Sequence, residues 1–278
     1  MGEEVTIRAM TTPWRQLFPQ PCPLIGVVHL QPLPGAPLWA GDLEAVLRAA
    51  LADVEAYLEG GADGLIVENF GDVPFWGDRV PPETVASMAR IATAVVARSP
   101  VPVGINVLRN DALAGLAIAQ ASGARFIRVN VLTGATVTDQ GLLQGPAAEL
   151  LRRRRLLGAD GVRILADVLV KHGAPLAPLA MGEAVRDVLA RGGADGVIVS
   201  GSGTGRATDP GDLEQARGAV AGAPVLIGSG ATVETMATLA ARCDGVIVGT
   251  ALKHGGVLDQ PVDPRRVRDL KRVLPQSP

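Results

Sequence analysis

Carboxylates and amides that could carry acid–base chemistry recur at one position of a repeated sequence unit. When the copies of the unit are superposed, Glu68, Asn130, Ser200 and Gly249 occupy the same position, and Asp167 lies two residues beyond it. Side chains two residues apart on a β-strand point to the same side. A buried carboxylate is unfavourable unless it is paired or functional. We therefore predict that Glu68 and Asp167 belong to a site, with structural pairing inside a barrel as the alternative.

Basic side chains at neighbouring positions would complete an acid–base arrangement. Asp167 or Glu68 is the candidate general base, and His29 or Lys171 is the candidate general acid. Lys171 could instead form a Schiff base with a carbonyl substrate, or a plain salt bridge with Asp167. His29 could equally be a structural histidine. The further residues that we predict to bind or orient a substrate are Asn69, Asn106, Arg109, Arg128, Asn130, His172 and Ser200.

Three glycine-rich stretches indicate an anion-binding site. They span residues 200–205, 228–230 and 249–250. Glycine lets backbone amides approach an anion closely, and a helix that follows directs its N-terminus at that anion. The alternative is that these glycines only make tight turns. The residues that we predict to bind a phosphate are Ser202, Thr204, Gly205, Gly228, Ser229, Gly230, Gly249 and Thr250.

The repeated unit itself predicts the elements that position these residues. A Gly-Ala-Asp-Gly stretch at 61–64, 158–161 and 193–196 follows an Ala/Leu-rich helical pattern and precedes an apolar run. This order is typical of a helix that ends on glycine, a short turn and a buried parallel strand. Together with the other apolar runs, the predicted strands are 24–30, 64–68, 102–107, 126–131, 162–167, 195–199, 224–227 and 245–248.

The alternation of strand and helix predicts one closed (β/α)8 barrel, a TIM barrel, over residues 21–278, with 1–20 as an N-terminal extension. An open doubly wound sheet is the alternative. Asp42 is positioned to cap the first helix, and Asp263 to cap the last. In such barrels the active site lies where the strands end, and phosphate commonly binds to the loops after strands seven and eight. Two of the glycine-rich stretches fall in those loops.

The composition indicates which kinds of partner and which cellular compartment we can expect. The 278 residues are 47% hydrophobic and 19% charged, with a formal net charge of −2. This balance excludes disorder and argues against a nucleic-acid partner, which normally meets a basic face. Cys22 and Cys243 lie far apart in the sequence and form no CxxC motif, which favours a reducing compartment over a disulfide framework or a zinc site. No apolar run is long enough to span a membrane and the N-terminus has no apolar signal core, so we expect a cytoplasmic protein. We also expect a homo-oligomer without a cofactor.

Eight stretches of the chain carry a family resemblance. They are GVVHLQPLPGAP (26–37), GLIVENFGDVPF (64–75), GINVLRND (104–111), FIRVNVLTGA (126–135), ILADVLVKH (164–172), VIVSGSGTG (197–205), VLIGSGAT (225–232) and VIVGTALKHGG (246–256). In this order they resemble the BtpA family, which includes SgcQ-like proteins. The resemblance implies a barrel of the ribulose-phosphate-binding type. It also implies a role in photosystem I biogenesis at thylakoid membranes for the namesake of the family, and an association with sugar-uptake genes for SgcQ-like members. Residues 38–40 and 234–235 depart from the family pattern, and the first departure lies in the loop after the first strand.

Two functions remain open at this point. The first is an enzyme that acts on a phosphorylated sugar or nucleoside-like metabolite, as an isomerase, lyase or hydrolase. The second is a non-catalytic assembly factor, with peripheral membrane association, for which Trp14, Phe18 and Trp39 would supply an exposed apolar patch. The same three side chains could instead form a lid or a dimer contact. A metal-dependent hydrolase is disfavoured because the chain has no HxH or HExxH pair.

Overall fold

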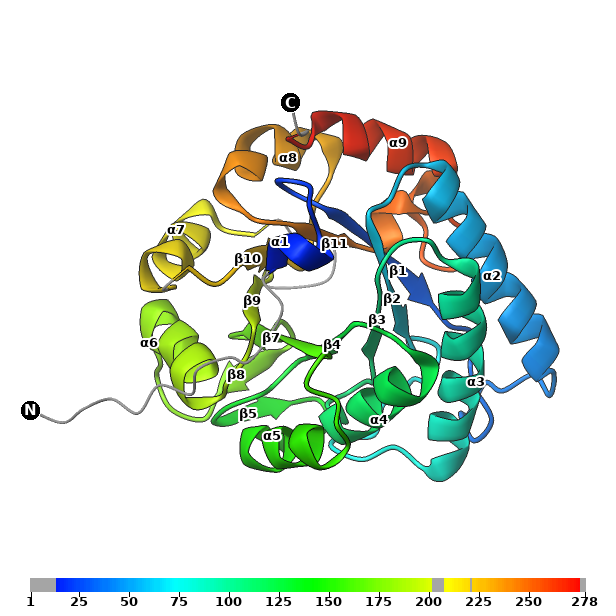
Figure 1. Cartoon of the computed structure of the whole chain (residues 1–278), viewed down its shortest axis with the longest axis horizontal. Coiled ribbons are helices and arrows are strands. Elements are labelled where there is room, and N and C mark those ends of the chain that lie inside the picture. Colours follow the sequence, from blue (N-terminus) through cyan, green and yellow to red (C-terminus); the bar gives the residue numbers. More distant parts are fainter. Residues whose placement is uncertain (1–13, 202–207, 221, 276–278) are drawn as a thin grey trace, which may run out of the picture.

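The computed structural model describes residues 14–201, 208–220 and 222–275. Eight parallel strands close into a barrel, and helices surround it on the outside (Figure 1). Around the ring the strands follow in the order β1-β11-β10-β9-β7-β4-β3-β2, which confirms the predicted (β/α)8 barrel and excludes the open sheet. The strands of the barrel are β1 Leu24–His29, β2 Gly64–Glu68, β3 Val103–Asn106, β4 Phe126–Val129, β7 Arg163–Val168, β9 Gly196–Val199, β10 Val225–Ile227 and β11 Val246–Val248.

The outer layer consists of helices that alternate with these strands along the chain. Asp42 accepts the N–H of Ala45 (3.0 Å) at the start of the first of them, and Asp263 accepts the N–H of Arg265 (2.9 Å) at the start of the last, as the sequence predicts. The helices are α2 Leu43–Glu59, α3 Pro82–Arg98, α4 Ala112–Ser122, α5 Ala147–Leu156, α6 Met181–Arg186, α7 Pro210–Ala219, α8 Val233–Leu239 and α9 Pro264–Val273.

Two of the aspartates in the repeated unit, Asp63 and Asp195, bind the backbone of a neighbouring strand. Asp63 accepts the N–H of Leu24 (2.8 Å), and Asp195 accepts the N–H of Ile164 (2.8 Å). In each case the carboxylate binds a backbone N–H near the beginning of the neighbouring strand. These aspartates therefore tie adjacent strands together at the N-terminal end of the barrel, which is the end opposite to Glu68.

The N-terminal end of the barrel is closed by the segment that precedes β1. Helix α1 (Trp14–Leu17) lies over the centre of the ring in Figure 1, and Phe18 behind it is fully buried against the ring of Phe126. The Trp14 indole donates to the carbonyl oxygen of Asp244 (3.2 Å). The interpretation of Phe18 as part of an exposed patch, a lid or a dimer contact is therefore wrong. Gly64 at the start of β2 makes room for this ring, since a Cβ there would lie 2.7 Å from Cε1 of Phe18.

A second, three-stranded antiparallel sheet lies outside the barrel. It consists of β5 (Ala135–Thr138), β6 (Gly141–Gln144) and β8 (Gly173–Pro175), in the order β6-β5-β8. β5 and β6 belong to the connection after β4, whereas β8 belongs to the connection after β7. Because Thr138 pairs with Gly173, the sheet holds the loop that carries Lys171 and His172 against the loop after β4.

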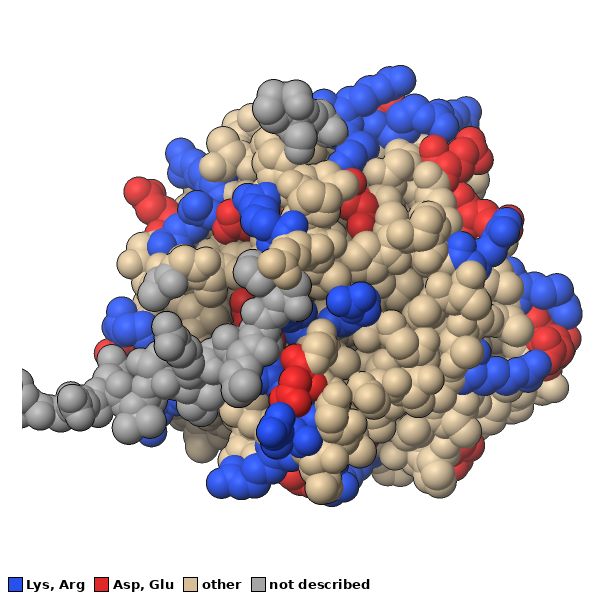
Figure 2. Space-filling model, in the orientation of Figure 1, with Lys and Arg blue, Asp and Glu red and all other residues tan. Residues whose placement is uncertain are grey.

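The fold brings the two cysteines together. Their sulfur atoms lie 3.6 Å apart, and both side chains are buried as free thiols at the beginning of β1 and β11. On the face seen in Figure 2, basic and acidic side chains lie intermixed. Within the described ranges, no helix combines the length and the apolar character that crossing a bilayer requires.

Candidate functional site

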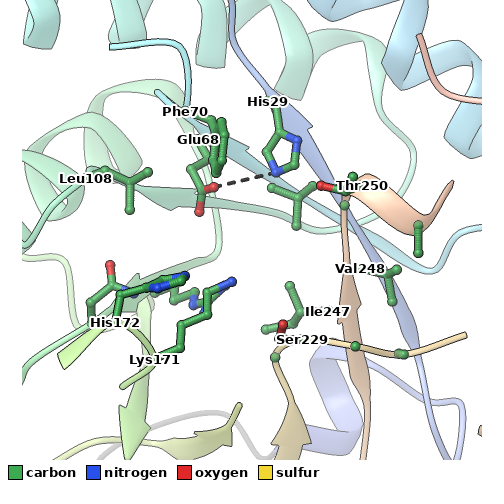
Figure 3. A pocket seen from close by; sticks show the side chains of 18 of the residues that line it. His29, Glu68, Phe70, Leu108, Lys171, His172, Ser229, Ile247, Val248 and Thr250 are labelled. Carbon is green, nitrogen blue, oxygen red and sulfur yellow. Dashed lines mark ion pairs between the residues drawn. The ribbon is translucent and has the colours of Figure 1, made fainter. Parts of the chain in front are cut away.

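A cavity of about 220 Å³ opens at the C-terminal ends of the barrel strands (Figure 3). The predicted site residues that line it are His29, Glu68, Arg109, Arg128, Asn130, Lys171, His172, Gly228, Ser229, Gly230, Gly249 and Thr250. The predicted residues outside its lining are Asn69, Asn106, Asp167 and Ser200. Ser202, Thr204 and Gly205 lie outside the described residues. Most of the predicted site residues therefore line the same cavity.

Glu68 and His29 form a buried carboxylate–imidazole pair at one wall of the cavity. The two residues are register partners on β2 and β1, and Oε1 of Glu68 lies 3.7 Å from Nε2 of His29 (Figure 3). Burial raises the pKa of the Glu68 carboxyl. Burial, together with the positive charges of Lys253, Lys171 and Arg128, lowers the pKa of His29 to about 3. His29 is therefore a neutral imidazole near pH 7.

Asp167 is fully engaged by neighbouring side chains. Its carboxylate accepts two hydrogen bonds from the guanidinium of Arg128 (2.8 and 2.9 Å), one from Asn130 (3.2 Å) and one from the Ser200 hydroxyl (3.1 Å). The side chain of Asp167 is 0% exposed. These four hydrogen bonds favour the alternative in which Asp167 is a structural partner of Arg128 over the one in which it is a general base. The carboxylate holds Arg128, and the guanidinium is the part of the pair that lines the cavity.

The buried amides connect strands rather than face a ligand. Asn69 accepts the N–H of Leu108 (2.7 Å) and donates to Asp72 (3.0 Å), so it links the loops after β2 and β3. Asn106 donates to Oδ1 of Asn130 (3.2 Å). Of these amide side chains, only Asn130 reaches the cavity, where it lies next to Arg128.

Arg109 and Lys171 approach the cavity from the loops after β3 and β7. Arg109 donates from Nη2 to the carbonyl oxygen of Lys171 (2.7 Å), which joins the two loops. Figure 3 shows Lys171 and His172 on the side of the cavity that faces Ser229 and Thr250. Burial lowers the pKa of Lys171, with a further contribution from Arg128. His172 has a left-handed backbone (φ 58°), a conformation that non-glycine residues adopt mainly where the surroundings impose it.

The glycine turns after β10 and β11 form the opposite side of the cavity. Gly228 donates its N–H to the carbonyl oxygen of Val199 (2.9 Å), so this amide is already used. Among the described residues, no acceptor lies in hydrogen-bonding position for the N–H groups of Gly230, Gly249 and Thr250. The glycines also have packing roles, because a Cβ on Gly249 would lie 2.5 Å from the His29 ring. The helix expected directly behind β11 is a single 3-10 turn (Thr250–Leu252).

Sequence reasoning missed the apolar side chains around the cavity. Phe70, Phe75 and Leu108 line it from the loops after β2 and β3, and the Phe70 ring packs against His29 with ring centroids 4.6 Å apart. These loops show no periodicity that could have indicated which residues turn inward. In the described ranges, no group of three or more His, Cys, Asp or Glu side chains is arranged to hold a metal ion.

Comparison with known proteins gives the same family as the motifs. The sequence model of the BtpA family matches residues 20–275. The photosystem I biogenesis protein BtpA of Synechocystis sp. is 51% identical over 252 residues, which cover 91% of this chain and 88% of that protein. An uncharacterised protein of Pyrococcus furiosus is 46% identical, with 90% and 94% covered. Among solved structures, N-(5'-phosphoribosyl)anthranilate isomerase from the same archaeon is similar, with a TM-score of 0.55 and 15% identity over 91% of this chain and 98% of the isomerase.

Proposed function

This chain belongs to the BtpA family, and on that premise we propose that it is an enzyme that binds a phosphorylated small metabolite in the cavity and transfers a proton on it. One observation carries the proposal. The cavity combines backbone N–H groups that have no acceptor among the described residues on one side with Glu68 and Lys171 on the other, and the pKa of each of these two groups is shifted by burial. Groups with shifted pKa values in a cleft are typical of catalytic sites.

The phosphate would bind to the turns after β10 and β11. The N–H groups of Gly230, Gly249 and Thr250 and the Thr250 hydroxyl are its donors, and each residue lines the cavity. Three such charge-assisted bonds at about 1.5 kcal/mol each correspond to a dissociation constant of roughly 0.5 mM. This affinity would hold the phosphate while the remaining contacts select the substrate. The similarity to a phosphoribosyl-substrate isomerase supports the proposal at the level of the fold.

The chemistry would depend on Glu68 and Lys171. Burial raises the pKa of the Glu68 carboxyl and lowers that of the Lys171 amine, so both shifts favour the exchange of a proton with a substrate. His29, as a neutral imidazole, would donate a hydrogen bond to a substrate oxygen. Arg128, held by Asp167, would stabilise negative charge that develops on the substrate. Proton transfer of this kind serves an isomerase, a lyase or a hydrolase.

The phosphate site can be tested on the amides themselves. Titration of the 15N-labelled protein with inorganic phosphate should shift the amide resonances of Gly230, Gly249 and Thr250, and leave that of Gly134 unchanged because Gly134 lies outside the cavity. Unshifted resonances at the three turn residues would remove the phosphate site. Turnover is then measured with a panel of sugar phosphates, where Glu68→Gln should reduce the rate at least about 100-fold.

A second candidate function, a non-catalytic assembly factor, is favoured by a different observation. The loops at the C-terminal end of the barrel expose the apolar side chains of Trp76 (61%), Leu142 (51%) and Leu176 (66%). Exposed apolar groups of this size are typical of surfaces that meet a partner. The name of the Synechocystis relative refers to an assembly process. If Glu68→Gln preserves the cellular role of the protein while Trp76→Ser abolishes it, the scaffold function replaces the enzymatic one.

A further inference from the structure

Arg109 is a buried cation without a counter-ion in the part of the chain that the structure describes. Among the described residues, the other buried lysine and arginine side chains each have a carboxylate within 4.0 Å: Arg128 with Asp167, Arg154 and Arg163 with Asp195, and Lys253 with Asp53. Arg109 is 6% exposed and has none. Its Nη2 donates to a backbone carbonyl oxygen, and its Nε is buried without an acceptor in the part of the chain that the structure describes.

An uncompensated buried charge is costly, because desolvation is not offset by an opposite charge. Burial lowers the pKa of Arg109, whereas the carboxylates of Asp167, Asp139 and Glu68, none of them paired with it within 4.0 Å, act in the opposite direction. The rest of the fold supplies an aspartate wherever a cation is buried, so the absence of one at Arg109 needs a reason. Arg109 lines the cavity. A ligand in the cavity can therefore provide the missing negative charge.

The strand order places Arg109 and the turn after β10 on opposite sides of the barrel, which makes a second acid group of the ligand the candidate for that negative charge. In the ring of strands, β3, which precedes Arg109, lies four positions from β10, which precedes Gly230, in either direction. Eight strands about 4.8 Å apart and tilted by about 36° form a ring roughly 15 Å across. The guanidinium of Arg109 also donates a hydrogen bond to the backbone carbonyl oxygen of Lys171, in the loop after β7. Arg109, anchored to the loop after β7 by the Lys171 carbonyl oxygen, thus forms a second cationic subsite across the ring from the turn after β10.

We propose that the ligand carries two acid groups: a phosphate at the turns after β10 and β11, and a second acid group at Arg109. The substrate class is a phosphorylated organic acid or a bisphosphate. A planar guanidinium binds a carboxylate or a phosphate with two parallel hydrogen bonds. The inference rests on the phosphate site proposed above, and its test separates the two.

Calorimetry with matched ligands measures the second subsite. Phosphate esters with two, three and four carbons are compared in pairs, one member with a terminal carboxylate and the other with a hydroxymethyl group in its place, and corresponding bisphosphates form a third arm. For at least one chain length the acid or the bisphosphate should bind at least tenfold more tightly than the alcohol. Arg109→Gln should remove this gain and leave the affinity for the alcohol within twofold. Arg79→Gln, which changes an exposed arginine outside the cavity, should retain the gain.

The outcomes distinguish the two proposals. If the alcohols bind and neither acids nor bisphosphates bind more tightly at any length, the second subsite is wrong and the phosphate site stands. If inorganic phosphate and all esters fail to bind, both are wrong. The thermal stability of the ligand-free protein gives an independent measure. Arg109→Gln should keep or raise the melting temperature, whereas Arg163→Gln, which breaks a paired cation, should lower it. An equal loss in both variants would make Arg109 a structural cation and overturn the inference.

Discussion

Arg128 and Asp167 form a two-bond ion pair in the wall of the cavity, with the guanidinium exposed to the cavity and the carboxylate buried behind it. The carboxylate has no oxygen left for a substrate, because Asn130 and Ser200 also donate to it. Glu68, which lies two residues before the equivalent position on β2, has no such guanidinium partner within the described residues. Two carboxylates that look alike in the sequence therefore differ in their partners: Asp167 is paired with a guanidinium, and Glu68 lies beside a neutral imidazole.

Asp167→Asn should destabilise the protein, because it leaves the charge of Arg128 buried and unpaired. We expect a loss of about 3–5 kcal/mol in the free energy of unfolding. Urea denaturation at pH 7 measures the change. Asp187→Asn provides the control, since Asp187 pairs with Arg191 on the surface and should change stability by less than about 0.5 kcal/mol. Equal small effects in the two variants would contradict the role of Asp167 as the counter-ion of Arg128.

His29 should make stability depend on pH. Its folded-state pKa of about 3 lies below the unfolded value of about 6.5, so the unfolded chain binds more protons between these values and stability falls as the pH decreases. Between pH 7 and pH 5 this group should account for a loss of about 2 kcal/mol. The measurement is the difference in unfolding free energy between pH 7 and pH 5 for the wild type and for His29→Gln. The same slope in both proteins would show that His29 is not held neutral by its surroundings.

Cys22 and Cys243 should form a disulfide when the protein is treated with diamide, an azo compound that accepts the two thiol hydrogens. The sulfur atoms are 3.6 Å apart and need to approach to about 2.05 Å. Mass spectrometry should show the loss of two hydrogens, reversed by dithiothreitol, and Cys22→Ser should abolish it. Because the bond would join residues 221 positions apart, the oxidised form should be more stable by about 2–4 kcal/mol. If both thiols are still alkylated after diamide treatment and denaturation, the prediction is wrong.

Phe18→Ala should destabilise the barrel without changing its assembly. The side chain is fully buried against Phe126 and the beginning of β2, so its removal leaves a cavity at the N-terminal end. We expect a loss of about 3–5 kcal/mol, measured by chemical denaturation. Size-exclusion chromatography should show the same oligomeric state as the wild type. A change of oligomeric state without a loss of stability would restore the interpretation of Phe18 as a dimer contact.

The sequence by itself determined the order of the elements and the positions where polar groups leave the strands. Local sequence determines helix caps such as Asp42 and Asp263. It also determines the two-residue period that places His29 and Glu68 on the inner side of their strands. The repeated aspartate was visible as well, although its role of tying strands together was not.

Only the tertiary structure decided which groups meet. The pairing of Asp167 with Arg128, the contact of Cys22 with Cys243, the burial of Phe18 under the barrel and the lack of a counter-ion at Arg109 each join or separate segments far apart in the chain. Closure of the ring sets these distances, and sequence spacing contains no information about them. Charge states follow from the same contacts, because burial and partners shift the pKa values of Glu68 and His29.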